Sequence, residues 1–520
     1  MPVASIVWVD DEIESLRSQK IFLETKGYTV NTFTNGFDAL DFIKENPVDV
    51  VLLDESMPGI SGLQTLAKVK EHNQTIPVVL ITKNETESLM DDAIGSQITD
   101  YLLKPVNPNQ VLLSLKKIID NKRLVAEKTT SAYQQQFREL FMALNNSPDY
   151  NEWMELYKKI VFWEMEMAKS NSPEMQEVLA TQKDEANTEF FKFISKNYAK
   201  WVHAKSADAP IMSHNVLQFK VLPHLEKDTP LFFVLIDNLR LDQWKVIQPV
   251  FAESFRILEE DTFYSILPTA TQYSRNAIFS GLLPIDLEKQ FPQQWRNDDD
   301  EGGKNLFEEA FLQAQLKRLK KDNIKFSYTK ILNHADGQQL VNSIHNLLHN
   351  DLNVIVYNFV DMLSHARTEM EVLKELASDE VSYRSVTRSW FEHSPLHQAL
   401  KKIADKKIKL IVATDHGSVR VKTPFKVIGD KQTTANLRYK HGRNLNYEAK
   451  EVLAFKDPKE AGLPVPTVNS SYIFAKEDGF LCYPNNYNHY VNYYKNTFQH
   501  GGVSLEEMII PLIKMVSKAP

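Results

Sequence analysis

The segment VVLLDESMPG, residues 50–59, decides the fold of the N-terminal part of the chain. Its four apolar residues end at the acidic Asp54, and the turn-forming pair Pro58-Gly59 follows. A short apolar run bounded by turn signals indicates a buried strand of a parallel sheet, with Asp54 at its carboxyl end. We therefore expect Asp54 to lie in the crevice where open α/β sheets bind their ligands.

Four further strand-like runs accompany this segment within residues 1–120. They are SIVWV, YTVNTF, PVVLITK and DYLLK, and amphipathic helical patterns lie between them. Five strands that alternate with helices predict a five-stranded parallel sheet of the doubly wound, flavodoxin-like type. The strand ends bring together carboxylates, a hydroxyl and an ammonium group, carried by Asp10, Asp11, Asp54, Thr82 and Lys104.

This set of side chains has the chemistry of a phospho-aspartate switch. Carboxylate oxygens are ligands that Mg²⁺ prefers, and one carboxylate can accept a phosphoryl group. The Lys104 ammonium can pair with that group, and the Thr82 hydroxyl can hydrogen-bond it and move its loop. Any one of these residues alone would more simply be a solvated strand end, so the prediction depends on their occurring together and in order.

Residues 1–122 resemble the response-regulator receiver family. The resemblance implies that Asp54 is the phosphoacceptor, that a sensor histidine kinase is a partner and that phosphorylation promotes a homodimer. It also implies three Mg²⁺ ligands, which are Asp10, Asp11 and Asp54. The switch residues that it implies are Thr82, Tyr101 and Lys104. Lys83 stands where the family prefers a small residue, which would narrow access to Asp54.

The next segment, residues 123–205, has no strand pattern. Aromatic and aliphatic residues recur at helical spacing, for example Trp153, Leu156 and Ile160, and Ser147-Pro148 and Ser172-Pro173 divide the segment. We expect three helices that form a small bundle between the flanking domains. Such stripes are more often core than a cofactor site, so no chemistry is assigned to them.

Alternation of strands and helices returns in residues 206–520, which predicts a third, α/β domain. The apolar strands LFFVLID, NVIVYNFVD and IKLIVATDHG each end in potential metal ligands, and SILPTATQYSRNAIFSG places Thr271 at the start of a helix. Mixed oxygen and nitrogen donors of this kind suit two Zn²⁺ ions. The candidate ligands are Asp237, Thr271, Asp361, His365, Asp415, His416 and His500.

The order of these ligands resembles the alkaline phosphatase superfamily. DNLRLDQ, RYKHGRN and HGGVSLEEMIIPL resemble its PglZ branch over roughly residues 230–515. The resemblance implies that Thr271, rather than Thr269, is the nucleophile of a two-zinc phosphohydrolase. It implies two ligand groups, which are Asp237, Thr271, Asp415 and His416 for one ion and Asp361, His365 and His500 for the other.

Substrate contacts are expected from a basic stretch and from the Thr271 helix. Within the basic stretch at residues 420–443, Arg438, Lys440 and Arg443 are candidates for binding phosphate oxygens, because a planar guanidinium can do so in a bidentate way. Asn276, five residues after Thr271, is a further candidate donor. A solvated run of surface charge is the alternative interpretation of the basic stretch.

The cysteine count, the apolar runs and the net charge of the chain exclude several classes of protein. The single cysteine, Cys482, and the absence of a long apolar run predict a cytoplasmic protein without disulfides or a transmembrane segment. Residues 1–120 carry the whole formal net charge of −8, which argues against a general nucleic-acid coat.

The domain layout resembles response regulators linked to type IX secretion, and this implies a phosphodiesterase acting on nucleotides or on short linear or cyclic oligonucleotides. The alternative is an adaptor that docks the cytoplasmic segment of a secretion motor or a sigma factor. A DNA-binding regulator is disfavoured, because no compact basic helix module is evident in the sequence.

Overall fold

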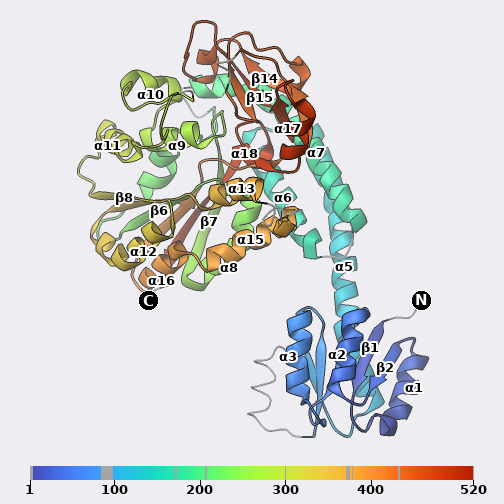
Figure 1. The fold of residues 1–520 in the computed structure, drawn as a ribbon. Coiled ribbons are helices and arrows are strands. Elements are labelled where there is room, and N and C mark those ends of the chain that lie inside the picture. Colours follow the sequence, from blue (N-terminus) through green and yellow to red (C-terminus); the bar gives the residue numbers. More distant parts are fainter. Residues whose placement is uncertain are drawn as a thin grey trace. The chain divides into compact units, whose positions relative to one another are not determined.

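The computed structural model forms two compact units, residues 1–134 and 135–520 (Figure 1). It describes residues 4–83, 98–169, 173–204, 208–298, 300–370, 375–377, 379–430 and 434–518, with no account of the side chains of 120–131 and 365–369. Within these ranges, no helix is both long enough and apolar enough to span a membrane.

The N-terminal unit is built on a five-stranded parallel sheet with strand order β2-β1-β3-β4-β5, which confirms the predicted flavodoxin-like receiver fold. Its strands are β1 (Ser5–Val9), β2 (Thr29–Phe33), β3 (Val50–Asp54), β4 (Val78–Thr82) and β5 (Asp100–Leu103). The helices are α1 (Arg17–Thr25), α2 (Gly36–Glu45), α3 (Gly62–His72) and the start of α5 (Pro108–Asn145). The helix expected between β4 and β5 falls on residues 84–97, outside the described residues.

Alternate side chains of the central strands enter two apolar clusters, one on each face of this sheet. Trp8 and Leu52 lie in one cluster, and Val9 and Leu53 lie in the other. Behind the end of β3 the backbone is crowded, because a Cβ on Gly62 would lie 2.3 Å from the Asp54 carbonyl oxygen. Glycine at that position lets α3 begin directly against the strand end that carries Asp54.

The three helices that the sequence predicted between the flanking domains do not form a compact unit of their own. Helix α5 runs unbroken past residue 122, and α6 (Tyr150–Lys169) and α7 (Pro173–His203) are part of the C-terminal unit. The Tyr198 hydroxyl accepts a hydrogen bond from the Leu267 amide at 2.7 Å, and the Phe190 and Tyr264 rings stack. The apolar stripes of α6 and α7 therefore pack on the α/β domain as well as on each other.

The C-terminal unit contains a six-stranded sheet of order β7-β18-β10-β6-β9-β8. Strands β10, β6, β9 and β8 are parallel, whereas β18 is antiparallel to both β10 and β7. The strand bounds are β6 (Leu231–Ile236), β7 (Phe255–Tyr264), β8 (Phe326–Ile331), β9 (Leu352–Tyr357), β10 (Lys409–Ala413) and β18 (Ile509–Ser517).

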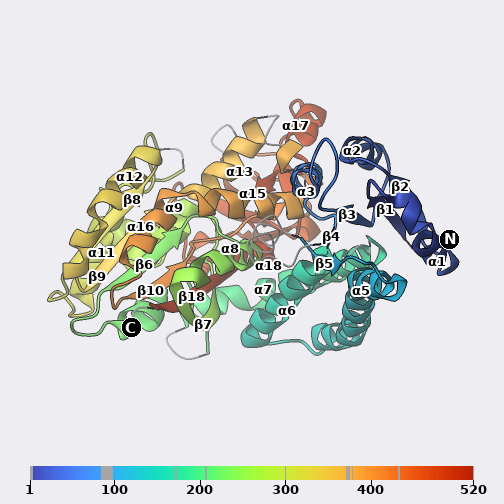
Figure 2. The ribbon, with the colours of Figure 1, turned by 90° about the horizontal axis from the view of Figure 1, so that it is seen from below.

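Helices cover this sheet in pairs, with α8 beside α15 and α12 beside α16 (Figure 2), and with α9 beside α11. Their bounds are α8 (Leu241–Ser254), α9 (Thr271–Ser280), α10 (Pro284–Gln290), α11 (Glu308–Arg318), α12 (His334–Ser343), α13 (Phe359–Glu369), α15 (Glu380–Glu392) and α16 (Pro395–Ile403).

Shorter strands follow β10 in the sequence and pair in three small sheets. The three-stranded sheet has the order β13-β15-β14, and β12 pairs with β16 and β11 with β17. These elements are β11 (Val419–Arg420), β12 (Thr423–Lys426), β13 (Tyr439–Gly442), β14 (Val452–Phe455), β15 (Ser471–Ala475), β16 (Gly479–Cys482), α17 (Tyr487–Tyr494), β17 (Phe498–Gln499) and α18 (Leu505–Met508). The β11–β17 pair brings the segment after His416 beside the segment before His500.

Candidate active site

The receiver crevice joins the predicted acidic residues and the predicted lysine. The Lys104 ammonium lies 2.9 Å from Asp10 Oδ2 and 2.9 Å from Asp54 Oδ1. Ligand oxygens of Asp10, Asp11 and Asp54 lie within 4.8 Å of one another, so the three carboxylates can hold one metal ion. Burial raises the pKa of Asp54, although the hydrogen bond from Lys104 opposes that shift. The oxygen-only donor set fits Mg²⁺.

Of the three predicted switch residues, Lys104 lies in this crevice, and Thr82 and Tyr101 differ in their surroundings. Thr82 is buried at the end of β4, and its hydroxyl donates a hydrogen bond to the Glu55 carboxylate. Tyr101 lies on β5 with 43% of its surface exposed. The Thr82 hydroxyl is thus already directed toward the residue that follows Asp54.

The first group of predicted zinc ligands meets at the carboxyl ends of β6 and β10. Asp237 follows β6, Asp415 and His416 follow β10, and potential ligand atoms of the three buried residues lie within 4.8 Å of one another. Thr271, the first residue of α9, places its hydroxyl oxygen 3.0 Å from His416 Nε2 and 3.3 Å from Asp237 Oδ1. Thr271 thus lies beside the cluster of Asp237, Asp415 and His416, and the assignment of all four residues to one ion stays a prediction.

The second group lies directly beside the first. His500 Nε2 is 3.7 Å from Asp361 Oδ1, and Asp361 is near the start of α13. The rings of His500 and His416 stack with centroids 4.2 Å apart. His365 lies four residues after Asp361 in α13, one turn along the helix, but its side chain is outside the described residues.

Backbone carbonyls orient both ring systems. His416 Nδ1 lies 3.1 Å from the Gly417 carbonyl oxygen, and His500 Nδ1 lies 3.2 Å from the Thr269 carbonyl oxygen. In each ring this leaves Nε2 directed at a carboxylate, an orientation typical of histidine metal ligands. Burial lowers the pKa of His416, which favours the neutral imidazole that binds metal.

Arg275 is a site residue that the sequence analysis missed. Its buried guanidinium lies 2.6 Å from Asp237 Oδ2 through Nη2 and 3.1 Å from Asp415 Oδ2 through Nε. Nε is also 3.4 Å from the buried Glu308 carboxylate. Arg275 is the fourth residue after Thr271 in α9, so both side chains lie on one helix face. That spacing was the available signal, and arginine's usual surface location concealed it.

The electrostatics of the first group are dominated by buried negative charge. Burial raises the pKa of Asp237 well above its usual value, and the nearby Asp415 and Asp361 add to the shift while Arg275 opposes it. Lys330 pairs with Glu308 at 2.7 Å, but the single Arg275 guanidinium does not balance the three aspartates, so a divalent cation at the site would be strongly favoured. The buried oxygen and nitrogen donors fit Zn²⁺.

The structure separates the roles of the two threonines. Thr269 donates a hydrogen bond to the Gly502 carbonyl and accepts one from the Gly501 amide, both at 3.0 Å. Its hydroxyl is fully buried in this contact with the loop after His500. Thr271 instead directs its hydroxyl at His416 and Asp237.

The predicted substrate-binding residues need correction, because three of them are engaged with the protein. Arg438 is fully buried and bidentate to Glu507, with contacts of 2.6 and 3.1 Å. Buried Lys440 donates to the Thr434 carbonyl at 3.0 Å. Asn276 donates to the Lys304 carbonyl at 3.2 Å. We assign structural roles to Arg438, Lys440 and Asn276. Arg443 lies 3.8 Å from the Asp430 carboxylate, but 46% of its side chain is exposed, and it stays a substrate candidate.

Three protein families match successive parts of the chain. The response regulator receiver domain matches residues 6–116, and the PorX response regulator linker domain matches residues 123–202. The BREX system PglZ alkaline phosphatase-like domain matches residues 216–515, more than half of the chain.

Curated relatives and solved structures match shorter parts of the chain. The transcriptional regulatory protein SrrA of Staphylococcus aureus is 32% identical over 114 residues, which are 22% of this chain and 47% of SrrA. PgtA, the phosphoglycerate transport system transcriptional regulatory protein of Salmonella typhimurium, is 28% identical over 155 residues, 30% of this chain and 36% of PgtA. The chain thus spans less than half the length of either protein.

Among solved structures, a receiver domain protein from Clostridium thermocellum is 29% identical, with 23% of this chain and 98% of that chain covered and a TM-score of 0.22. The family matches cover the receiver, the helical segment and the α/β domain in turn. The chain is a response regulator of the PorX type, and its C-terminal domain belongs to the PglZ family of alkaline phosphatase-like domains.

Proposed function

We propose that this response regulator is a zinc-dependent phosphodiesterase controlled by phosphorylation of Asp54. The observation that carries the proposal is the position of the Thr271 hydroxyl, 3.0 Å from His416 and 3.3 Å from Asp237 at the first turn of α9. A hydroxyl among buried metal ligands at a helix N-terminus has the surroundings that a phosphoryl-transfer nucleophile needs.

Two ions would be held by the two ligand groups, the first by Asp237, Thr271, Asp415 and His416 and the second by Asp361, His365 and His500. When bound, they would lower the pKa of the attacking hydroxyl and offset charge on phosphoryl oxygens. At the start of α9 the Tyr273 and Ser274 amides donate to the Ala270 carbonyl. The Thr271 and Gln272 amides precede these bonds, so they could donate to an oxygen of the substrate phosphate beside Thr271.

Nucleotides and short linear or cyclic oligonucleotides are the substrates we propose, with a link to type IX secretion. Both follow from the resemblance to PorX-type regulators, whose linker and output domains match this chain. Arg443 lies 3.8 Å from the Asp430 carboxylate and is partly exposed, and we propose that it contacts substrate phosphates. The receiver domain implies a sensor kinase as the source of the phosphoryl group.

The test is hydrolysis of a panel of nucleotide monoesters, linear dinucleotides and cyclic dinucleotides by the full chain, with and without added Zn²⁺. Zinc-dependent turnover of the diesters is the expected result. Elemental analysis should find two zinc ions in the parent and one in Asp361→Ala or His500→Ala, because the first group keeps its own ligands. No diester turnover in the zinc-loaded parent would refute the enzyme proposal.

An adaptor role is a second candidate, favoured by the exposure of Tyr101 on β5. Receivers use conformational switching to change partners, so phosphorylation would promote a homodimer and docking of a secretion-motor segment or a sigma factor. Light scattering with and without the phosphoryl mimic beryllofluoride tests the dimer, and an unchanged mass would contradict it.

A further inference from the structure

Helix α7 binds the first turn of α18 through two side chains. Asn187 accepts a hydrogen bond from the Leu505 amide at 2.8 Å and donates one to Glu506 Oε2 at 3.2 Å. One turn earlier, Lys183 Nζ lies 2.8 Å from Glu506 Oε1. Asn187 and Glu506 are both buried. Two successive turns of α7 thus hold the position of α18.

Helix α18 in turn supports the loop that carries His500. The Glu507 carboxylate accepts a hydrogen bond from the Gly502 amide at 2.9 Å and from the Ser504 hydroxyl at 2.7 Å. It also binds the buried Arg438 guanidinium. The backbone two residues after His500 is therefore fixed to α18.

The same short helix supports the loop that carries His416. The Gly417 amide donates to the Glu507 carbonyl at 3.2 Å. A Cβ on Gly417 would lie 2.0 Å from the Glu506 carbonyl oxygen, so the two backbones are in direct contact. Since His416 immediately precedes Gly417, a shift of α18 would move the backbone of this ligand as well.

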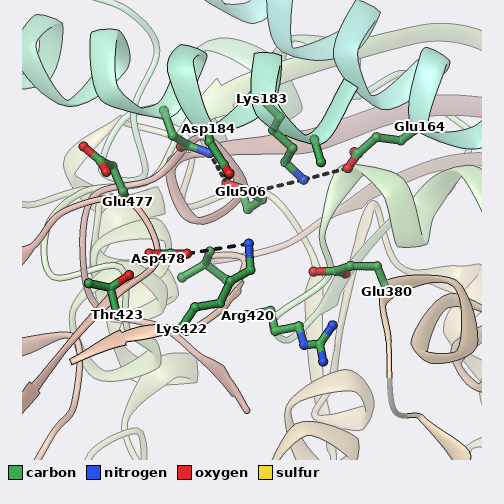
Figure 3. A pocket seen from close by; sticks show the side chains of 13 residues that line it. Glu164, Lys183, Asp184, Glu380, Arg420, Lys422, Thr423, Glu477, Asp478 and Glu506 are labelled. Atoms are coloured by element: carbon green, nitrogen blue, oxygen red, sulfur yellow. Dashed lines mark hydrogen bonds and ion pairs between the residues drawn. The ribbon is translucent and has the colours of Figure 1, made fainter. Parts of the chain in front are cut away.

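A cavity of about 390 Å³ borders the contact between α7 and α18 (Figure 3). Lys183 extends from α7 toward Glu506 and toward Glu164, with Nζ 2.9 Å from the Glu164 carboxylate (Figure 3). The lining is mostly charged, including Asp184 and Glu380. Because open space lies beside Lys183 and Glu506, polar contacts rather than close apolar packing hold α7 to α18 at this point.

We propose that Lys183 and Asn187 are positioning residues for the metal site, acting through α18 on the loops of His416 and His500. The proposal deepens the proposed function and rests on the assignment of these histidines as ligands. Groups that orient metal ligands typically contribute 10–100-fold to metal affinity or activity. The helical segment between the receiver and the output domain thereby becomes part of the metal site's support.

The experiment compares Asn187→Ala and Lys183→Met with the parent in the full chain. Gln182→Ala is the matched control, because Gln182 is a buried neighbour on α7 whose side chain donates to the Phe137 carbonyl of α5. Lys183→Arg keeps the positive charge and serves as the conservative variant. Amide hydrogen exchange of peptides covering residues 414–420 and 500–508 is measured on metal-free protein, and zinc affinity by competition with a chelator.

Asn187→Ala and Lys183→Met should accelerate amide exchange in both peptides and weaken zinc binding by roughly tenfold or more. In turnover measurements kcat should fall, whereas KM should change less. Gln182→Ala should leave both peptides and zinc affinity at parental values, and Lys183→Arg should restore most of the loss. Parental exchange in both peptides of Asn187→Ala would overturn the proposal. Hydrogen exchange on metal-free protein needs neither bound zinc nor turnover. A failure of the proposed enzyme function would instead appear as absent diester turnover in the zinc-loaded parent, so the two failures are distinguishable.

Discussion

The Arg275 guanidinium lies 2.6 Å from the Asp237 carboxylate, and both side chains are at most 1% exposed. This buried ion pair joins the helix that begins at Thr271 to the end of β6. Arg275 contacts Asp237 through Oδ2, while Oδ1 of the same carboxylate faces Thr271 and His416. The two oxygens of Asp237 thus have separate partners. Oδ2 binds Arg275, and Oδ1 faces the candidate metal position.

Arg275→Gln should destabilise the metal-free C-terminal unit by about 3–5 kcal/mol, because it leaves buried carboxylates without their cation. Zinc should reduce the loss, since an ion supplies positive charge to the same carboxylates. Urea unfolding of metal-free and zinc-loaded protein measures both effects. The control is Arg388→Gln, whose exposed pair with Glu392 contributes less than about 1 kcal/mol. Equal losses in the two variants would contradict the assignment of Arg275.

Thr271→Val should lower diester turnover by on the order of a thousandfold, because it removes the proposed nucleophile and retains the side-chain shape. Zinc content should fall only modestly, as the carboxylate and histidine ligands remain. Thr269→Val is the comparison variant. It should cost about 1–3 kcal/mol of stability, because it leaves the buried Gly501 amide without its acceptor. Near-parental turnover in Thr271→Val would remove the nucleophile assignment.

Asp54→Ala should abolish labelling by a small phosphodonor such as acetyl phosphate. Asp54 lies 2.9 Å from the Lys104 ammonium. Asp10 is equally close to that ammonium and also buried, and the acceptor role that we assign to Asp54 follows from the resemblance to the receiver family. Phosphoryl incorporation is measured by intact mass. Labelling of the variant at the parental level would show that another carboxylate is the acceptor.

The burial of Lys440 predicts that the free energy of unfolding depends on pH. Burial lowers the pKa of Lys440 to about 7 from its ordinary value of 10.5. Between these two values the unfolded chain binds more protons at Lys440 than the folded chain does, so this residue's destabilising effect diminishes as pH rises from 7 to 10.5. Below pH 7 both states are protonated, and the full cost applies.

Lys440→Met should therefore raise the melting temperature at pH 7, with a gain that shrinks toward pH 10. The comparison of variant with parent at each pH cancels the titration of all other groups. Thermal melts at half-unit pH steps measure the difference. A gain that is constant from pH 7 to pH 10 would show that Lys440 titrates normally in the folded chain.

The sequence by itself determined the domain order, the receiver fold and most candidate ligands of both sites. It could do so because the information is local. Apolar runs identify parallel strands, and the carboxyl ends of the parallel strands in one sheet converge. The polar residues that follow these strands therefore meet at one edge of each sheet, as Asp54 does in the first sheet and Asp237 in the second. The start of α9 at Thr271 was equally predictable from its local sequence.

Only the tertiary structure decided the roles of the buried charges and of the helical segment. Arg438 looked like a phosphate-binding residue in the sequence, but its partner Glu507 is 69 residues away in the chain. Arg275 and the contacts of Asn187 with α18 were hidden for the same reason. A charged side chain becomes structural when folding removes its water and supplies an opposite charge, and that partner comes from a distant segment that no local pattern identifies.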